Sequence, residues 1–248
     1  MSSPLARSKV LVPLIVSNPT LEFVIIVNPN SGPGSEPWWP NADYVRDIPS
    51  LTGHANVQVV GYISTDYCKR SIEKVLEDVN RYGTWSQDCR FPGLAVSGIF
   101  FDETPNVFSE KVKDFLDTIT RHVKETDGIL GSKMVIHNPG TAIDARLASP
   151  GLDIATVAEL GYPDFKSSDH QNWLATSSLS RKQTSYMIYA VPEEEIEDFV
   201  VTELRNKVEY VFVTDRNTNV YSGFGSGWGK FIDAMAHQND LAFDESQS

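Results

Sequence analysis

Short runs of apolar residues recur along the chain, and each run ends in polar residues or turn formers. The runs at 10–16 and 23–27 are apolar almost throughout and lack the alternation expected of a strand with one wet face. Continuous apolar strands are typical of parallel sheets that are covered on both faces. We therefore predict eight buried strands, at residues 10–16, 23–27, 57–63, 94–101, 133–137, 154–158, 185–191 and 209–213.

Helical spacing of apolar residues appears between several of these runs. Residues 69–82 carry an inner face of Ile72, Val75, Leu76 and Val79. Residues 107–124 carry a similar stripe, made of Val112, Phe115, Leu116, Ile119 and Val123. Two further helices are predicted at 193–207, which has acids in its first turn, and at 230–237. The pattern is weak after the second strand, and short or irregular after the fifth and sixth.

Strands alternating with helices predict an α/β fold, a single (β/α)₈ TIM barrel in which some helices are irregular or missing. The chain has 248 residues, which agrees with the roughly 250 that such a barrel takes. We find no interior linker and no repeat beyond the strand–helix alternation. The sequence therefore predicts one domain over residues 8–238, followed by a disordered acidic tail at 239–248.

The charge balance narrows the class of partner. A net charge of −12 argues against a nucleic-acid groove or an anionic membrane surface, and favours a neutral or cationic ligand. The only cysteines, Cys68 and Cys89, exclude a thiolate metal cluster and leave a single bridge between them open. We expect no cofactor and a monomer.

The N-terminal apolar run superficially resembles a secretion signal, because Arg7 and Lys9 precede it. However, the run is short and contains Pro13, and Asn18-Pro19-Thr20 follows it where a signal would carry small residues. No run approaches the ~20 apolar residues that cross a bilayer. The sequence alone therefore predicts a first strand, and a cytoplasmic protein without a membrane segment.

Asp102 and Glu103 stand at the end of the 94–101 run, and Thr104-Pro105 ends the strand. Adjacent strand residues point to opposite faces, so one acid should face the barrel axis and the other its wall. Two acids at the end of a buried strand are costly unless they are paired, hydrogen-bonded or used. An isolated Asp-Glu pair is also typical of a helix N-cap, and that alternative stays open here.

Polar and aromatic residues follow the other runs as well, at the rim where barrel enzymes place their chemistry. Carboxylates, amides and flat rings together are typical of a carbohydrate site. The candidate catalytic acids are Asp102, Glu103 and Glu159. The candidate substrate-binding residues are Asn28, Asn30, Trp38, Trp39, Tyr62, Asp66, Tyr67, His137, Asn138, Tyr162, Asp215, Tyr221 and Trp228.

Several of these assignments have alternatives. Trp38 and Trp39 could form a packed lid instead of a stacking platform, and His137 could be a hydrogen-bonded wall residue. The acids, with Asp215, could hold magnesium. Residues 31–34 lack the spacing and lysine of a phosphate-binding loop, and neither a Gly-x-Ser-x-Gly elbow nor a paired-histidine zinc motif is present.

Taken in order, the motifs resemble those of the spherulin-4 family from about residue 10 to residue 240. They are Val12-Pro-Leu, residues 27–34, Gly61-Tyr62, Thr65-x-Tyr67, Arg70, residues 98–103 and Asn138-Pro-Gly140. The resemblance implies a (β/α)₈ glycoside hydrolase, since the family includes a fungal enzyme that cuts within galactosaminogalactan at N-acetylgalactosamine linkages. It also implies that Asp102, Glu103 and Glu159 are the essential acids, and it suggests a secreted or cell-surface location.

Our hypothesis is that Asp102 is the nucleophile and Glu159 the general acid/base, while Glu103 orients one of them. Crowded carboxylates do not all ionise easily, so one of the three should have a raised pKa. A separation of about 5 to 5.5 Å would imply retention of configuration, which we favour, and roughly 6.5 to 9.5 Å inversion. A non-catalytic carbohydrate-binding barrel and a magnesium-dependent hydrolase or lyase remain as alternatives.

Overall fold

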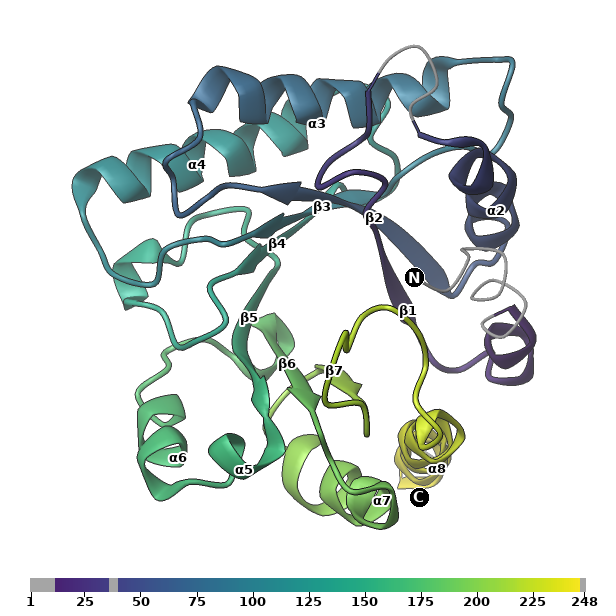
Figure 1. Cartoon of the computed structure of the whole chain (residues 1–248), viewed down its shortest axis with the longest axis vertical. Coiled ribbons are helices and arrows are strands. Elements are labelled where there is room, and N and C mark those ends of the chain that lie inside the picture. The colour runs from purple at the N-terminus through teal and green to yellow at the C-terminus, as the bar shows by residue number, and fades with distance from the viewer. Residues whose placement is uncertain (1–11, 36–39, 246–248) are drawn as a thin grey trace.

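One curled sheet organises the molecule. In this computed structural model, which describes residues 12–35 and 40–245, the sheet is parallel throughout and its strands follow chain order. The helices lie on the outside of the curl (Figure 1). The strands are β1 (Phe23–Val27), β2 (Val57–Ser64), β3 (Gly98–Asp102), β4 (Met134–Asn138), β5 (Ile154–Gly161), β6 (Thr184–Tyr189) and β7 (Tyr210–Val213).

The predicted first strand is wrong, because residues 12–17 are helical. Within this segment Ile15 is fully buried while Val16 is 59% exposed, so only one side of the run packs. The Asn18 backbone N–H donates to Leu14 O, four residues back, as in a helix. The described residues therefore form seven strands, with β1 and β7 as edges, and not the closed eight-stranded barrel that we predicted.

The helices begin at well-formed caps. Asn41, Ser71 and Ser109 each accept backbone N–H groups at the start of α2, α3 and α4. The bounds are α2 (Ala42–Thr52), α3 (Ile72–Gln87), α4 (Glu110–Glu125), α5 (Tyr162–Phe165), α6 (Ser168–Leu174), α7 (Ile196–Asp198) and α8 (Trp228–Glu245). Short 3₁₀ turns occupy Ala145–Leu147, Arg181–Gln183 and Glu193–Glu195, and a π-helical turn occupies Phe199–Leu204.

Predicted and observed helices agree best for α3 and α4, whose predicted stripes contribute buried side chains. The predicted helix at 193–207 is instead a succession of 3₁₀, α and π turns. The last helix, α8, continues into the segment for which we predict a disordered tail. The domain boundaries at 8 and 238 stay predictions.

Two apolar clusters lie on the two faces of the sheet. The inner one, enclosed by the curl, consists of Val60, Phe100, Met134, Ile136 and Ile154. The larger outer one joins the sheet to the helices and includes side chains of α3, α4 and α8. Because side chains alternate along a strand, the inner cluster shows which residues at each strand end face the hollow of the curl.

A bulge in β5 changes this alternation before Glu159. Thr156 pairs with Ser185, but the next pair is Ala158 with Tyr186, so Val157 is an extra residue. Strict alternation from inward-facing Ile154 would send the Glu159 side chain outward to the helices. The extra residue turns it inward, opposite Met187, which packs against the inner cluster. The sequence pattern predicts that Glu159 lies just past the end of this strand, but β5 continues to Gly161 and Glu159 lies inside it.

Candidate active site

Three strand ends bring the central polar residues side by side. The register aligns Ser64 of β2 with Asp102 of β3, and Asp102 with Asn138 of β4. The Asp102 carboxylate accepts the Tyr62 hydroxyl at 2.6 Å on Oδ2. Its Oδ1 accepts Asn138 Nδ2 and the backbone N–H of Glu103, both at 2.8 Å. Asp102 is thus held from three sides, and it ends the strand that packs between β2 and β4.

The Asn138 amide connects Asp102 to Glu159. Its Nδ2 donates to Asp102 Oδ1 at 2.8 Å and also to Glu159 Oε2 at 2.5 Å. The Gly140 N–H donates to Asn138 Oδ1 at 3.0 Å, which fixes the amide with its nitrogen toward the acids. Because one nitrogen contacts both oxygens, these two oxygens are separated by about 5 Å or less.

Glu159 has a second donor from a distant part of the chain. The hydroxyl of Tyr221, in the segment after β7, donates to Glu159 Oε1 at 2.6 Å. The Tyr221 side chain remains 48% exposed. The backbone N–H of Glu159 donates to Gly140 O at 3.1 Å, so the loop after β4 holds its backbone while Asn138, at the end of β4, holds its carboxylate.

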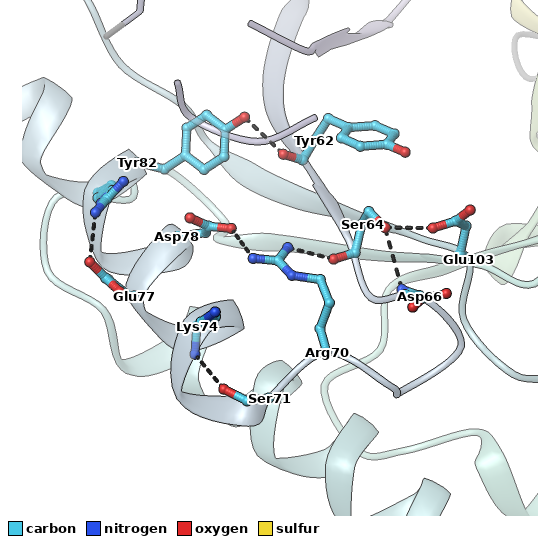
Figure 2. A network of polar contacts seen from close by, with 11 residues as sticks. Tyr62, Ser64, Asp66, Arg70, Ser71, Lys74, Glu77, Asp78, Tyr82 and Glu103 are labelled. Atoms are coloured by element: carbon cyan, nitrogen blue, oxygen red, sulfur yellow. Dashed lines mark hydrogen bonds and ion pairs between the residues drawn. The ribbon is translucent and has the colours of Figure 1, made fainter. Parts of the chain in front are cut away.

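Glu103 is oriented by its backbone. Its φ of +55° lies in the left-handed region, which takes it out of the strand alternation. Its carboxylate accepts the Ser64 hydroxyl at 2.5 Å, and Figure 2 shows the two side chains pointing at each other. The Arg70 guanidinium donates to the Ser64 carbonyl and to Asp78, both at 2.7 Å.

Two tyrosines donate to the acids. Burial and the neighbouring carboxylates raise the pKa of both Tyr62 and Tyr221 well above its usual range. Both hydroxyls therefore stay protonated at any pH at which the protein would work. They act as fixed donors to Asp102 and Glu159.

Several predicted binding residues lie near this cluster. Tyr67 is 54% exposed, and its N–H donates to Glu103 O at 2.7 Å. Asp66 and Tyr67 have φ values of +46° and +52°, so the turn after β2 is left-handed. The Asn28 carbonyl accepts the Tyr44 hydroxyl at 2.8 Å, and Asn30 lines a cavity beside Ser64. Trp38 and Trp39 lie outside the described residues.

His137 lies on the outer face of β4, against α4, and not with Asn138. It is 3% exposed, and its Nε2 lies 3.1 Å from Thr120 Oγ1. Its ring packs edge-on against Phe101. The side chain therefore faces away from the three acids and is placed as a hydrogen-bonded wall residue would be, while a substrate-binding role for it stays a prediction.

Tyr162, Asp215 and Trp228 make contacts of other kinds. The Tyr162 hydroxyl donates to Glu195 at 2.5 Å. Asp215 accepts the N–H and the hydroxyl of Ser226; burial would raise its pKa, but these bonds lower it below the usual value. The Trp228 ring stacks on Phe224 with centroids 4.5 Å apart. None of these contacts reaches the three acids, and a substrate-binding role for the three residues stays a prediction.

Sequence reasoning gave no role to Ser64 or Trp173. Ser64 directly follows the 57–63 run, so the register between β2 and β3 would have indicated it. Trp173 of α6 is 46% exposed, and its Nε1 donates to Thr141 Oγ1 at 2.7 Å. Thr141 follows Gly140, which contacts Glu159, so this ring stands beside the loop after β4. The sequence pattern around residue 173 carries no indication of that position.

In the described part of the chain, no group of three or more His, Cys, Asp and Glu side chains is placed to hold a metal ion. Cys68 and Cys89 are free, and burial raises the pKa of the Cys68 thiol to about 12. None of the helices between residues 12 and 245 has the length and apolar character of a membrane span.

The amino-acid sequence matches one protein-family model and is similar to a protein of that family. The model of spherulation-specific family 4 (Spherulin4) matches residues 9–235. Spherulin-4 of Physarum polycephalum is 29% identical over 166 residues, which are 67% of this chain and 45% of that protein. The match thus spans less than half the length of this relative.

Two solved structures are similar to this fold. The crystal structure of Aspergillus clavatus Sph3 in complex with GalNAc has a TM-score of 0.87 and 34% identity, covering 92% of this chain and 91% of that one. The tri-modular endo-beta-1,4-glucanase B (Cel5B) from Bacillus halodurans has a TM-score of 0.52 at 11% identity, covering 92% and 54%. The second match concerns the fold alone.

Proposed function

This chain belongs to spherulation-specific family 4, and from that premise we propose that it is a glycoside hydrolase acting on an amino-sugar polysaccharide. We propose further that it cuts within the polymer at N-acetylgalactosamine linkages, as in galactosaminogalactan. The similarity to Sph3, which was solved with GalNAc bound, supports a carbohydrate-active protein. The partner would be a poly- or oligosaccharide that contains galactosamine or N-acetylgalactosamine.

The observation that carries the proposal is the Asn138 bridge between Asp102 and Glu159. Two carboxylates from different strands approach one nitrogen and are kept about 5 Å apart or less by it. Retaining glycosidases place their two carboxyl groups about 5 to 5.5 Å apart, because one must attack the anomeric carbon while the other protonates the leaving oxygen. The approach of the two nearest oxygens is compatible with retention, and the stereochemistry of the product decides between retention and inversion.

The residues then take distinct parts. Asp102 attacks the anomeric carbon while Glu159 donates its proton to the departing glycosidic oxygen, which gives a covalent glycosyl–Asp102 ester. Glu159, now ionised, removes a proton from water, whose oxygen attacks the same carbon and releases Asp102. The Glu103 carboxylate accepts the Ser64 hydroxyl, and the Glu103 backbone N–H donates to Asp102 Oδ1, so we assign Glu103 to orienting the Asp102 carboxylate.

The test compares the wild type with Asp102→Asn and Glu159→Gln on galactosaminogalactan before and after de-N-acetylation. New reducing ends should appear with the wild type, and the rate should fall by about 10³-fold or more in either variant. The control is Glu194→Gln, which removes an exposed carboxylate outside the cluster and should leave the rate unchanged. Full activity in either acid variant would contradict the assignment.

The stereochemistry of the first product separates retention from inversion. Proton NMR during the first minutes of cleavage should show the anomer of the substrate before mutarotation mixes the two forms. Binding without new reducing ends would favour a non-catalytic carbohydrate-binding barrel. Activity lost on chelation and restored by magnesium would favour the metal-dependent alternative.

A further inference from the structure

A cavity of about 360 Å³ lies beside Ser64 and takes no part in the mechanism above. Its walls come from the loop after β1, the end of β2, the turn before α3 and α3 itself. The lining residues are Asn30, Ser31, Gly32, Pro33, Gly34, Ser64, Arg70 and Asp78. A volume at the low end of the range for ligand pockets suits one small ring.

Ser64 joins this cavity to the acids. The same residue lines the cavity and donates its hydroxyl to Glu103 at 2.5 Å. Figure 2 shows Arg70 and Asp78 on one side of Ser64 and Glu103 on the other. A substrate chain that occupies the acid cluster would therefore meet the cavity next to Glu103.

The charges in the cavity wall are paired. Arg70 Nη2 and Asp78 Oδ2 lie 2.7 Å apart, and only 26% and 16% of these side chains are exposed. A free guanidinium would select phosphate or carboxylate groups. With its charge offset by Asp78, the wall presents donors and acceptors without net charge, and Asn30 and Ser31 add an amide and a hydroxyl. Such a wall matches the hydroxyl and amide groups of a neutral sugar.

We propose that this cavity is a subsite that binds one neutral sugar ring of the substrate, adjacent to the ring held at the acids. The proposal rests on the proposed function and specifies how its substrate is held. The subsite would favour N-acetylated or unsubstituted rings over anionic ones, and it would add affinity only for chains long enough to reach it.

Gly32 offers a way to fill the cavity. A Cβ at Gly32 would lie 3.5 Å from Asp78 Oδ2 and 3.8 Å from Asp78 Cγ, which is ordinary contact. Gly32→Leu should therefore extend a side chain along the cavity wall without displacing the backbone, and Gly32→Ala should fill much less of it. Gly229→Leu is the matched control, because a Cβ at Gly229 meets nothing within 4 Å.

The measurement is calorimetric binding of N-acetylgalactosamine oligomers of increasing length, in a Glu159→Gln background where cleavage is blocked. In the parent, affinity should rise when the oligomer becomes long enough to enter the cavity. Gly32→Leu should lose that increment, about tenfold in Kd, while Gly229→Leu keeps it and Gly32→Ala is intermediate. The same length dependence in Gly32→Leu and parent, or no oligomer binding by the parent, would overturn the subsite.

A second variant covers the case in which Gly32→Leu does not fold. Asp78→Asn keeps the shape of the wall but leaves Arg70 unpaired, so long neutral oligomers should bind more weakly and inorganic phosphate should begin to compete. Unchanged oligomer affinity without phosphate competition would count against the subsite. Wild-type cleavage is assayed separately, so absent reducing ends with intact length-dependent binding would overturn the hydrolase and leave the subsite standing.

Discussion

At the scale of single residues, the backbone next to the acids is strained. Glu103, Asp66, Tyr67 and Cys68 all have positive φ, between +46° and +62°, a region that costs non-glycine residues about 1 kcal/mol or more each. Hydrogen bonds between the β2 and β3 turns, such as Thr65 N–H to Asp102 O at 3.0 Å, hold this conformation. This left-handed backbone conformation points the Glu103 side chain toward Ser64, while Asp102 faces the hollow of the sheet.

The Asn138 amide gives the sharpest prediction at this scale. Asn138→Leu keeps the approximate volume but removes both donors, so the two carboxylates lose the group that holds them in place. We expect kcat on the polysaccharide to fall by about 10²-fold, as for other preorganised donors, with a smaller change in KM. Steady-state kinetics would check this.

The matched control for that change is Asn80→Leu. Asn80 contacts His122 on the outer surface between α3 and α4, away from the acids. Its kcat should equal that of the wild type. An Asn138→Leu enzyme with wild-type kcat would show that the bridge does not position the acids.

At the scale of elements, α3 is fixed to the sheet by a close contact over a glycine. Three carbons of the Tyr82 ring lie 2.6 to 2.7 Å from where a Cβ at Gly61 would be. The Tyr82 hydroxyl donates to Tyr62 O at 2.9 Å. Tyr82 is fully buried, so the ring has no room to withdraw. This contact holds α3, and with it Arg70 and Asp78, against the end of β2.

Gly61→Ala should therefore destabilise the protein by about 2 kcal/mol, as overpacking of a filled core does. In a Tyr82→Leu background, which shortens the facing side chain, the same change should cost much less. The free energy of unfolding in urea for all four combinations gives the coupling between the two positions. Additive effects would mean that the ring does not press on Gly61.

At the scale of the whole molecule, the sheet stays open between β1 and β7. The segment between β7 and α8 runs across this gap (Figure 1). Its two ends are joined by the bonds of Ser226 to Asp215, and Gly225 is required beside them because a Cβ there would lie 1.6 Å from Asp215 Oδ1. Tyr221, on the same segment, reaches Glu159. The segment between β7 and α8 therefore spans the gap in the sheet and also supplies Tyr221 to the candidate site.

Acid stability of the whole molecule should depend on His137. Burial lowers its pKa from 6.5 to about 4, with a smaller opposing effect of Asp117. Between these values the unfolded chain binds the proton and the folded one does not. The contribution of the neutral His137 to the free energy of unfolding is therefore fully present above pH 6.5. It is lost as the pH falls toward 4, by about 3 kcal/mol in total.

Removing the imidazole should remove this dependence. Between pH 7 and pH 4, the free energy of unfolding in urea should fall in both proteins. The fall should be about 3 kcal/mol smaller in His137→Gln than in the wild type. His122→Gln, on the outer surface of α4, serves as the histidine control and should follow the wild type. Parallel pH curves for wild type and His137→Gln would contradict the buried neutral histidine.

The sequence by itself determined most of the sheet and part of the site. Seven of the eight predicted strands are present, since continuous apolar runs are stable only when both faces of a strand are covered. Asp102 follows from the same pattern, because it stands at the end of a run and shares the inward face of Phe100. Both inferences need only local periodicity.

Tertiary structure decided the rest. The 10–16 run is as apolar as a strand, yet residues 12–17 fold as a helix because only one side of the run meets the core. Alternation along β5 would point Glu159 at the helices, and the bulge at Val157 reverses this. Where a bulge falls, and which donors meet Glu159, depends on hydrogen bonding with a neighbouring strand and on Tyr221, far along the chain. A local pattern of side chains carries no record of such partners, so the meeting of Asp102 and Glu159 belongs to the folded molecule alone.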